Sequence, residues 1–101
     1  MEVTLFNNKI FKFNTINEFY DYEDFDKIKT CIIYTIKIEK FIKLPENLKE
    51  LFCNNNKLKT LDNLPKDLEK LSCENNPIIS INIQKSINYI NYKVPSILEF
   101  F

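Results

Sequence analysis

The side chains best suited to chemistry in this sequence are three cysteines, Cys31, Cys53 and Cys73. Cys53 and Cys73 lie twenty residues apart, and such a pair could act as a redox couple or as half of a metal site. Zinc usually requires four ligands, and the sequence contains no His, the commonest metal ligand and general base. The alternative is that each cysteine fills a small inward-facing core position. We favour the core interpretation, and we predict no catalytic residue, no metal site and no cofactor.

A second group with potential chemistry is acidic. Asp21, Glu23, Asp24 and Asp26 lie close together and could bind calcium through their carboxylates. They lack the spacing of an EF-hand and its turn glycine, so a solvated acidic surface is the better interpretation. The complete absence of Gly also excludes a glycine-rich phosphate loop. It further implies that left-handed backbone positions, which Gly normally occupies, fall to Asn or Asp.

Composition and charge narrow the classes of function further. The chain of 101 residues is the size of one domain, and 45% hydrophobic with 28% charged residues is typical of a globular protein. Fourteen basic residues, all of them Lys, balance fourteen acidic ones, which argues against a nucleic-acid partner. We expect no membrane association, because no apolar run is long enough to span a bilayer and the first residues do not resemble a signal peptide. The odd number of cysteines favours a reducing compartment.

The elements that would position these residues follow from an internal repeat. Segment 44–61 recurs twenty positions later as 64–81, and both copies fit the pattern L-P-x-x-L-x-x-L-x-C-x-x-N-x-[LI]-x-x-[LI]. A plain helical bundle is the alternative, but Pro45, Pro65 and Pro77 would interrupt its helices. Looser copies flank the two clear ones, upstream at Ile28, Cys31, Ile33, Ile38 and Phe41 and downstream at Ile83, Ile87, Ile90, Tyr92, Ile97 and Phe100.

The two clear copies resemble leucine-rich repeats of the short, twenty-residue class, which occurs in bacterial effectors and in proteins of giant viruses with AT-rich genomes. The resemblance implies a leucine-rich-repeat solenoid of about four coils, with one short parallel β-strand per coil and an irregular, extended convex side. It also implies that the amides of Asn56 and Asn76 hydrogen-bond backbone groups of their own and adjacent coils. The expected organisation is an N-terminal cap at 1–23 and repeats at 24–101, namely 24–43 (degenerate), 44–63 and 64–82 (clear) and 83–101 (a degenerate C-terminal cap).

The expected N-terminal cap contains a hairpin. Two apolar segments, 3–6 and 10–13, flank Asn7 and Asn8, and Asn tolerates the left-handed geometry of a tight turn. Thr15 and Glu18 then resemble a capping box, which would start a short helix that runs through Tyr22.

Side chains in each strand of such a repeat alternate between the core and the solvent. We expect four structural residues to point inward: Leu51, Cys53, Leu71 and Cys73. The residues between them would line the concave face in three rows: Thr30, Glu50, Lys70 and Tyr89; Ile32, Phe52, Ser72 and Asn91; and Tyr34, Asn54, Glu74 and Lys93.

Phe52, with Ile32 and Tyr34 beside it, would form an exposed apolar patch on this face. Such patches often mark protein–protein contacts, although single exposed hydrophobic residues are also common. We therefore predict a non-catalytic interaction module that binds a partner protein through the concave face. The alternative is a structural or self-assembling protein, in a virion or a scaffold. It would form homo-oligomers through the degenerate repeats at its two ends and through the terminal Phe100 and Phe101. The expected location is the cytoplasm, that of the host if the protein is viral, or the virion.

Overall fold

The computed structural model of this protein describes residues 1–81 and 89–91, and the side chains of residues 1–79. Along this part of the chain, an N-terminal hairpin is followed by a short helix, a single 3-10 turn and a series of short strands. The elements are β1 (Glu2–Leu5), β2 (Ile10–Lys12), α1 (Ile16–Tyr20), η1 (Phe25–Lys27), β3 (Ile28–Ile32), β4 (Glu50–Phe52), β5 (Thr60–Leu61), β6 (Lys70–Ser72), β7 (Ser80–Ile81) and β8 (Tyr89–Asn91).

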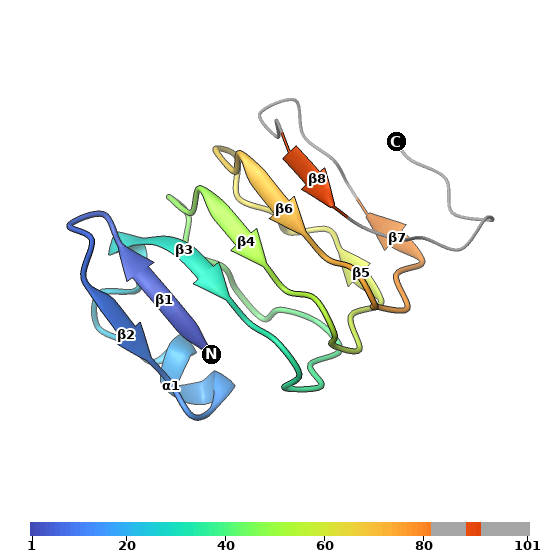
Figure 1. The fold of residues 1–101 in the computed structure, drawn as a ribbon, viewed down its shortest axis with the longest axis horizontal. Coiled ribbons are helices and arrows are strands. Elements are labelled where there is room, and N and C mark those ends of the chain that lie inside the picture. The colour runs from blue at the N-terminus through green and yellow to red at the C-terminus, as the bar shows by residue number, and fades with distance from the viewer. Residues whose placement is uncertain (82–88, 92–101) are drawn as a thin grey trace.

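Six of these strands form one mixed sheet in the order β2-β1-β3-β4-β6-β8 (Figure 1). Strand β1 runs antiparallel to both of its neighbours, β2 and β3. From β3 onward each strand is parallel to the next, and the paired residues of β3, β4 and β6 are twenty positions apart. Strands β5 and β7 form a separate two-stranded parallel sheet, in which Thr60 lies opposite Ser80.

The predicted leucine-rich-repeat solenoid is therefore wrong as the fold class, and so is the description of the chain as a repeat protein. The structure is a small mixed-sheet domain, 39 × 27 × 18 Å in extent, in which antiparallel and parallel strands share one sheet. The prediction treats the hairpin as a cap on a stack of coils, whereas β1 lies inside the sheet, between β2 and β3.

The physical reason for this difference lies in β1. Val3 is paired with Cys31 of β3, and both side chains are fully buried, so the antiparallel pairing adds Val3 to the same core. It also provides hydrogen-bond partners along one edge of β3, which would otherwise stay open. The twenty-residue motif carries no information about this pairing, because residues 1–23 lie outside it. The last degenerate copy, 83–101, lies outside the described residues except for β8.

The hairpin forms close to where the sequence predicts it. Its turn places Asn8 in the left-handed region, at φ 68°, and the N–H of Asn8 donates to the carbonyl of Leu5 at 2.9 Å. The N–H of Lys9 donates to the Asn7 side-chain oxygen at 3.0 Å. Asparagine thus serves where Gly would otherwise stand.

Helix α1 begins after Thr15, the expected N-cap, with a variant of the capping box in which the Glu18 carboxylate reaches the residue before the cap. The Thr15 hydroxyl accepts the N–H of Glu18 at 3.2 Å, and the Glu18 carboxylate accepts the N–H of Asn14 at 3.1 Å. The helix ends at Tyr20 and not at the predicted Tyr22, because the N–H of Tyr22 bonds the carbonyl only three residues earlier and tightens the turn. No helix in the described part of the chain is long and apolar enough to cross a membrane.

An aromatic cluster fixes these N-terminal elements to the rest of the molecule. The ring of the fully buried Phe19 lies 6.2 Å from that of Phe13 and 5.0 Å from that of Phe25. The neighbouring Tyr20 accepts a hydrogen bond through its hydroxyl from the N–H of Ile42 at 3.0 Å. The helix is therefore held both by apolar packing and by a bond to a distant loop.

A single core lies behind the six-stranded sheet and includes Leu61 of β5. The four residues expected to point inward, Leu51, Cys53, Leu71 and Cys73, have no exposed surface. Among residues 1–79 the other fully buried apolar side chains are Val3, Phe19, Ile28, Cys31, Ile33, Pro45, Leu48, Leu58, Leu68 and Ile78.

Asn76 connects two successive segments at the turn that follows β6. Its side-chain nitrogen donates to the carbonyls of Cys53 and Cys73 at 3.0 and 3.1 Å. Its side-chain oxygen accepts the N–H groups of Asn56 and Leu58 at 3.2 and 3.1 Å. Its nitrogen also donates to the carbonyl of Glu74 at 3.1 Å, so one amide pairs five backbone groups, which is the hydrogen bonding expected of this residue from the sequence.

Asn56 makes the equivalent connection one strand earlier. Its nitrogen donates to the carbonyls of Ile33 and Cys53 at 2.7 and 3.0 Å, and its oxygen accepts the N–H of Ile36 at 3.0 Å. Each amide therefore reaches back toward the segment that precedes it in the chain. Ile36 occupies the corresponding position of the first segment, where no earlier parallel strand exists, so an apolar residue is sufficient there.

Three residues at equivalent places in the turns adopt left-handed backbone conformations: Thr35, Asn55 and Asn75, with φ of 54°, 59° and 56°. The side-chain nitrogen of Asn75 donates to the Asn55 side-chain oxygen at 2.8 Å. The expectation that only Asn or Asp takes such positions is wrong for Thr35 and for Lys37, which has φ 58°. The turn imposes this conformation on Thr35, whose N–H donates to the carbonyl of Asn55 at 3.0 Å.

We expect Asn76→Ala to lower the free energy of unfolding by about 3 kcal/mol, because several buried backbone groups lose their partner and each unpaired group costs about 1–3 kcal/mol. Urea denaturation measures the change. The control is Asn17→Ala in α1, where the exposed side chain should contribute less than about 0.5 kcal/mol. Equal midpoints for the two variants would contradict a structural role for the buried amide.

Thr35→Asn should stabilise the protein by about 1 kcal/mol, because a β-branched residue is strained at positive φ and Asn is not. The expected rise in melting temperature is roughly 4–8 °C. The same substitution in an extended strand, Thr4→Asn, should instead lower the melting temperature. Thermal unfolding followed by circular dichroism distinguishes the two, and a fall for Thr35→Asn would show that the turn carries no strain.

Candidate functional site

The outer face of the six-stranded sheet, which is the face turned away from the core, carries the residues that the sequence proposes for binding. Strand pairing arranges these residues in the expected rows, with Thr30, Glu50, Lys70 and Tyr89 in the first and Ile32, Phe52, Ser72 and Asn91 in the second. Tyr34, Asn54 and Glu74 of the third row follow the ends of β3, β4 and β6, and Lys93 lies outside the described residues.

The first row is a continuous polar network across three strands. The Thr30 hydroxyl donates to one carboxylate oxygen of Glu50 at 2.7 Å, and the Lys70 ammonium lies 3.3 Å from the other oxygen. The Thr30 hydrogen bond and the Lys70 charge hold the pKa of the Glu50 carboxyl below its ordinary value, although partial burial opposes them. Glu50 is therefore held in one orientation.

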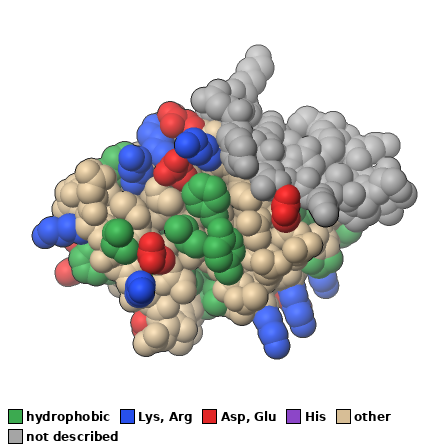
Figure 2. Space-filling model, viewed as in Figure 1, with side chains coloured by type: hydrophobic (Ala, Val, Ile, Leu, Met, Phe, Trp, Pro, Cys, Tyr) green, Lys and Arg blue, Asp and Glu red, His purple; other side chains and the backbone are tan. Residues whose placement is uncertain are grey.

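The second row contains the predicted apolar patch. Ile32 and Phe52 lie directly opposite each other on β3 and β4, and both are partly buried. Tyr34 follows two residues after Ile32, and 41% of its surface is exposed. Figure 2 shows hydrophobic side chains gathered near the middle of the molecule, with Lys, Asp and Glu side chains close beside them. The strand pairing thus places the patch beside a charged row.

Two residues expected to face the solvent are buried instead. Thr30 is 9% and Ser72 is 3% exposed. Both are short side chains with longer neighbours on the same face, Glu50 opposite Thr30 and Phe52 opposite Ser72, so they lie below the surface. They support the face and offer little area for a partner.

Asn54 also serves the structure more than a partner. Its side-chain oxygen accepts the Ser72 hydroxyl at 3.0 Å and the N–H of Glu74 at 2.6 Å. These two bonds connect the ends of β4 and β6. Within the predicted rows, the described side chains that offer accessible apolar area are those of Ile32, Tyr34 and Phe52.

The three cysteines lie in the core and form no disulfide. Burial raises the pKa of Cys31 and Cys53 well above the ordinary range and raises that of Cys73 to about 12. Thiolates are the reactive and metal-binding form, so none of the three is prepared for redox or metal chemistry. The core interpretation agrees with this burial.

The acidic residues near the helix do not converge on one point. Asp24 forms an ion pair with Lys27 at 3.3 Å, and Asp21, Glu23 and Asp26 are exposed. Across residues 1–81 and 89–91, no group of three or more His, Cys, Asp or Glu side chains is placed to hold a metal ion.

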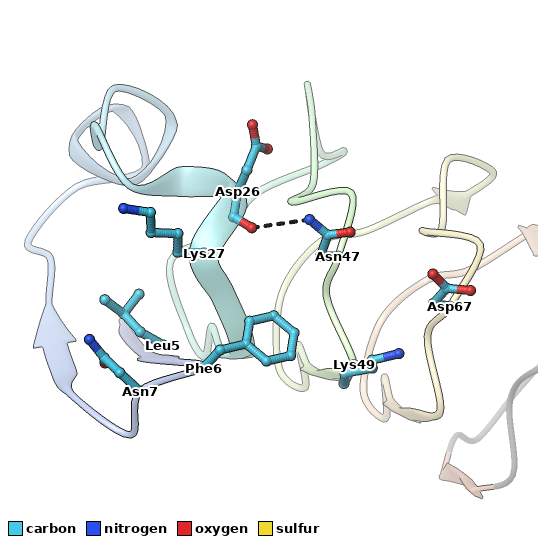
Figure 3. Close-up of a pocket in the computed structure, with 8 residues that line it drawn as sticks. All are labelled: Leu5, Phe6, Asn7, Asp26, Lys27, Asn47, Lys49 and Asp67. Atoms are coloured by element: carbon cyan, nitrogen blue, oxygen red, sulfur yellow. Dashed lines mark hydrogen bonds between the residues drawn. The ribbon is translucent and has the colours of Figure 1, made fainter.

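A groove of about 370 Å³ lies beside the hairpin turn, and no motif in the sequence indicates it (Figure 3). It depends on the pairing of β1 with β3, which brings the hairpin turn beside the segments that precede β3, β4 and β6. The side-chain nitrogen of Asn47 donates to the carbonyl of Asp26 at 3.3 Å across it. Its lining residues are Leu5, Phe6, Asn7, Asp26, Lys27, Asn47, Lys49 and Asp67. Its two lysines and two aspartates cancel in charge, and none of the residues proposed for binding lines it, so the outer face of the sheet stays the candidate site.

Glu50→Gln should lower stability by about 1 kcal/mol at pH 7, because the carboxylate loses its charge-assisted contacts with Thr30 and Lys70. The folded-state pKa of Glu50 is lowered, so its contribution is present above its ordinary value of 4.5 and is lost as the pH falls through the folded value. The two proteins should therefore converge in stability below this range. Urea denaturation between pH 7 and pH 3 measures the difference, and a constant gap would contradict the network.

Comparisons of this chain with models of protein families, with curated proteins and with solved structures find no match. The resemblance of residues 44–81 to repeats of bacterial effectors and giant-virus proteins therefore stays a prediction. The case for a function depends on the geometry of the outer face.

Proposed function

We propose that this protein is a non-catalytic interaction module that binds a partner protein through the outer face of its six-stranded sheet. The observation that carries the proposal is the pairing of Ile32 with Phe52 on adjacent strands, with the exposed Tyr34 following β3. Apolar and aromatic side chains grouped on a face of a sheet are typical anchors of a protein interface.

The partner that fits this surface presents an apolar side chain to the patch and polar groups to the row beside it. Glu50 and Lys70 form an ion pair with each other, so they add little binding energy but set which way a charged partner can lie. The strands hold these side chains in place, which lowers the entropy lost on binding. The apolar patch supplies affinity and the charged row supplies orientation.

We place this interaction in the cytoplasm. Three buried cysteines without a disulfide support a reducing compartment. A viral origin would make this the cytoplasm of the host.

The test is affinity capture with the double variant Phe52→Glu, Tyr34→Glu beside the unchanged protein, followed by quantitative mass spectrometry. Two carboxylates in the patch should reduce recovery of the specific partner at least about tenfold, because each would be desolvated without a counter-ion. Reconstitution with the purified partner then gives the change in dissociation constant.

The matched control is Ile42→Glu, which places the same charge on an exposed apolar residue, 72% exposed, outside the outer face. It should leave recovery unchanged. Circular dichroism must show that both variants fold. Equal partner recovery by the unchanged protein and the folded double variant would reject the outer face as the binding surface.

A further inference from the structure

Strand β2 ends the strand order of the six-stranded sheet, so within residues 1–81 and 89–91 no strand pairs with its second edge (Figure 1). The pairing with β1 fixes which backbone groups point to this edge. The N–H of Leu5 donates to the carbonyl of Lys9 and the N–H of Phe13 donates to the carbonyl of Met1, so alternate residues of β2 face β1. The N–H and C=O groups of Ile10 and Lys12 therefore point away from β1.

The side chains at this edge are unusually apolar for an open strand. Ile10 is 59% and Phe11 is 38% exposed, and Phe6 in the adjoining turn is 48% exposed. The ring of Phe11 lies 5.5 Å from that of Tyr22, which supports it from the core side of the sheet. An edge of this kind is a template for another strand.

We propose that β2 pairs with β2 of a second copy of this chain, antiparallel and about a two-fold axis, so that the two sheets become continuous. The outward groups select the register. When Phe11 lies opposite Phe11 of the second copy, Ile10 and Lys12 of each chain face Lys12 and Ile10 of the other, and all four outward residues exchange hydrogen bonds. A register centred on Ile10 or on Lys12 would pair fewer of the outward N–H and C=O groups of Ile10 and Lys12 between the two β2 strands.

This register also suits the side chains. The two Phe11 rings meet as a non-hydrogen-bonded pair, in which side chains approach most closely. Each Lys12 lies beside an Ile10 of the other copy, and each Lys9 lies opposite a Phe13. Like charges are therefore never directly opposite in this register. Opposed like charges would disfavour pairing of the two edges. The edge is self-complementary, as a two-fold interface requires.

Two substitutions at one position test the register. Ile10→Lys places an ammonium beside Lys12 of the second copy, and we expect the dimer dissociation constant to rise at least about tenfold. Ile10→Glu places a carboxylate beside the same lysine and should leave the constant unchanged or lower it. Sedimentation equilibrium over a concentration series measures both against the unchanged protein, whose mass should rise from 12.1 kDa toward twice that value.

The side chain of Ile10 is mostly exposed, so at concentrations where the protein is monomeric both variants should keep the melting temperature of the unchanged protein. The double variant Phe52→Glu, Tyr34→Glu should still dimerise, which separates this interface from the outer face. A monomer at every concentration would overturn the proposal. So would a dimer that survives Ile10→Lys, or one that the two charges weaken equally, since only the two-fold register distinguishes their signs.

Discussion

The side-chain amides of Asn56 and Asn76 are the interaction on which the rest of this structure depends. The short strands β4 and β6 supply few backbone hydrogen bonds, and the turns after them would leave buried carbonyl and N–H groups without partners. Each amide pairs with backbone groups of its own turn and of the preceding segment. The two amides therefore hold the turns after β4 and β6 against the segments that precede them.

On the outer face, too, polar side chains form hydrogen bonds within the protein. Thr30, Ser72 and Asn54 have their side chains engaged in bonds within the protein. What remains accessible is an apolar patch with an ion pair beside it. The polar side chains beside the patch are engaged in hydrogen bonds and an ion pair within the protein.

The sequence predicts part of this structure well, and the reasons are specific. Leu51, Cys53 and Asn56 recur at twenty-residue spacing, so their pairing with Leu71, Cys73 and Asn76 follows from periodicity. The fold class failed because β1 pairs with β3 through an antiparallel contact that leaves no periodic signal, and the same contact forms the groove beside Phe6. The burial of Thr30 and Ser72 was not predicted, because alternation shows to which face of the sheet a side chain points. It does not show whether longer neighbouring side chains cover it.

The backward reach of the asparagine amides makes each turn depend on a later part of the chain. The carbonyl of Ile33 accepts from Asn56 and the carbonyl of Cys53 accepts from Asn76, in both cases 23 residues further along the sequence. Loss of the later segment would therefore leave a buried carbonyl of the earlier turn without that partner.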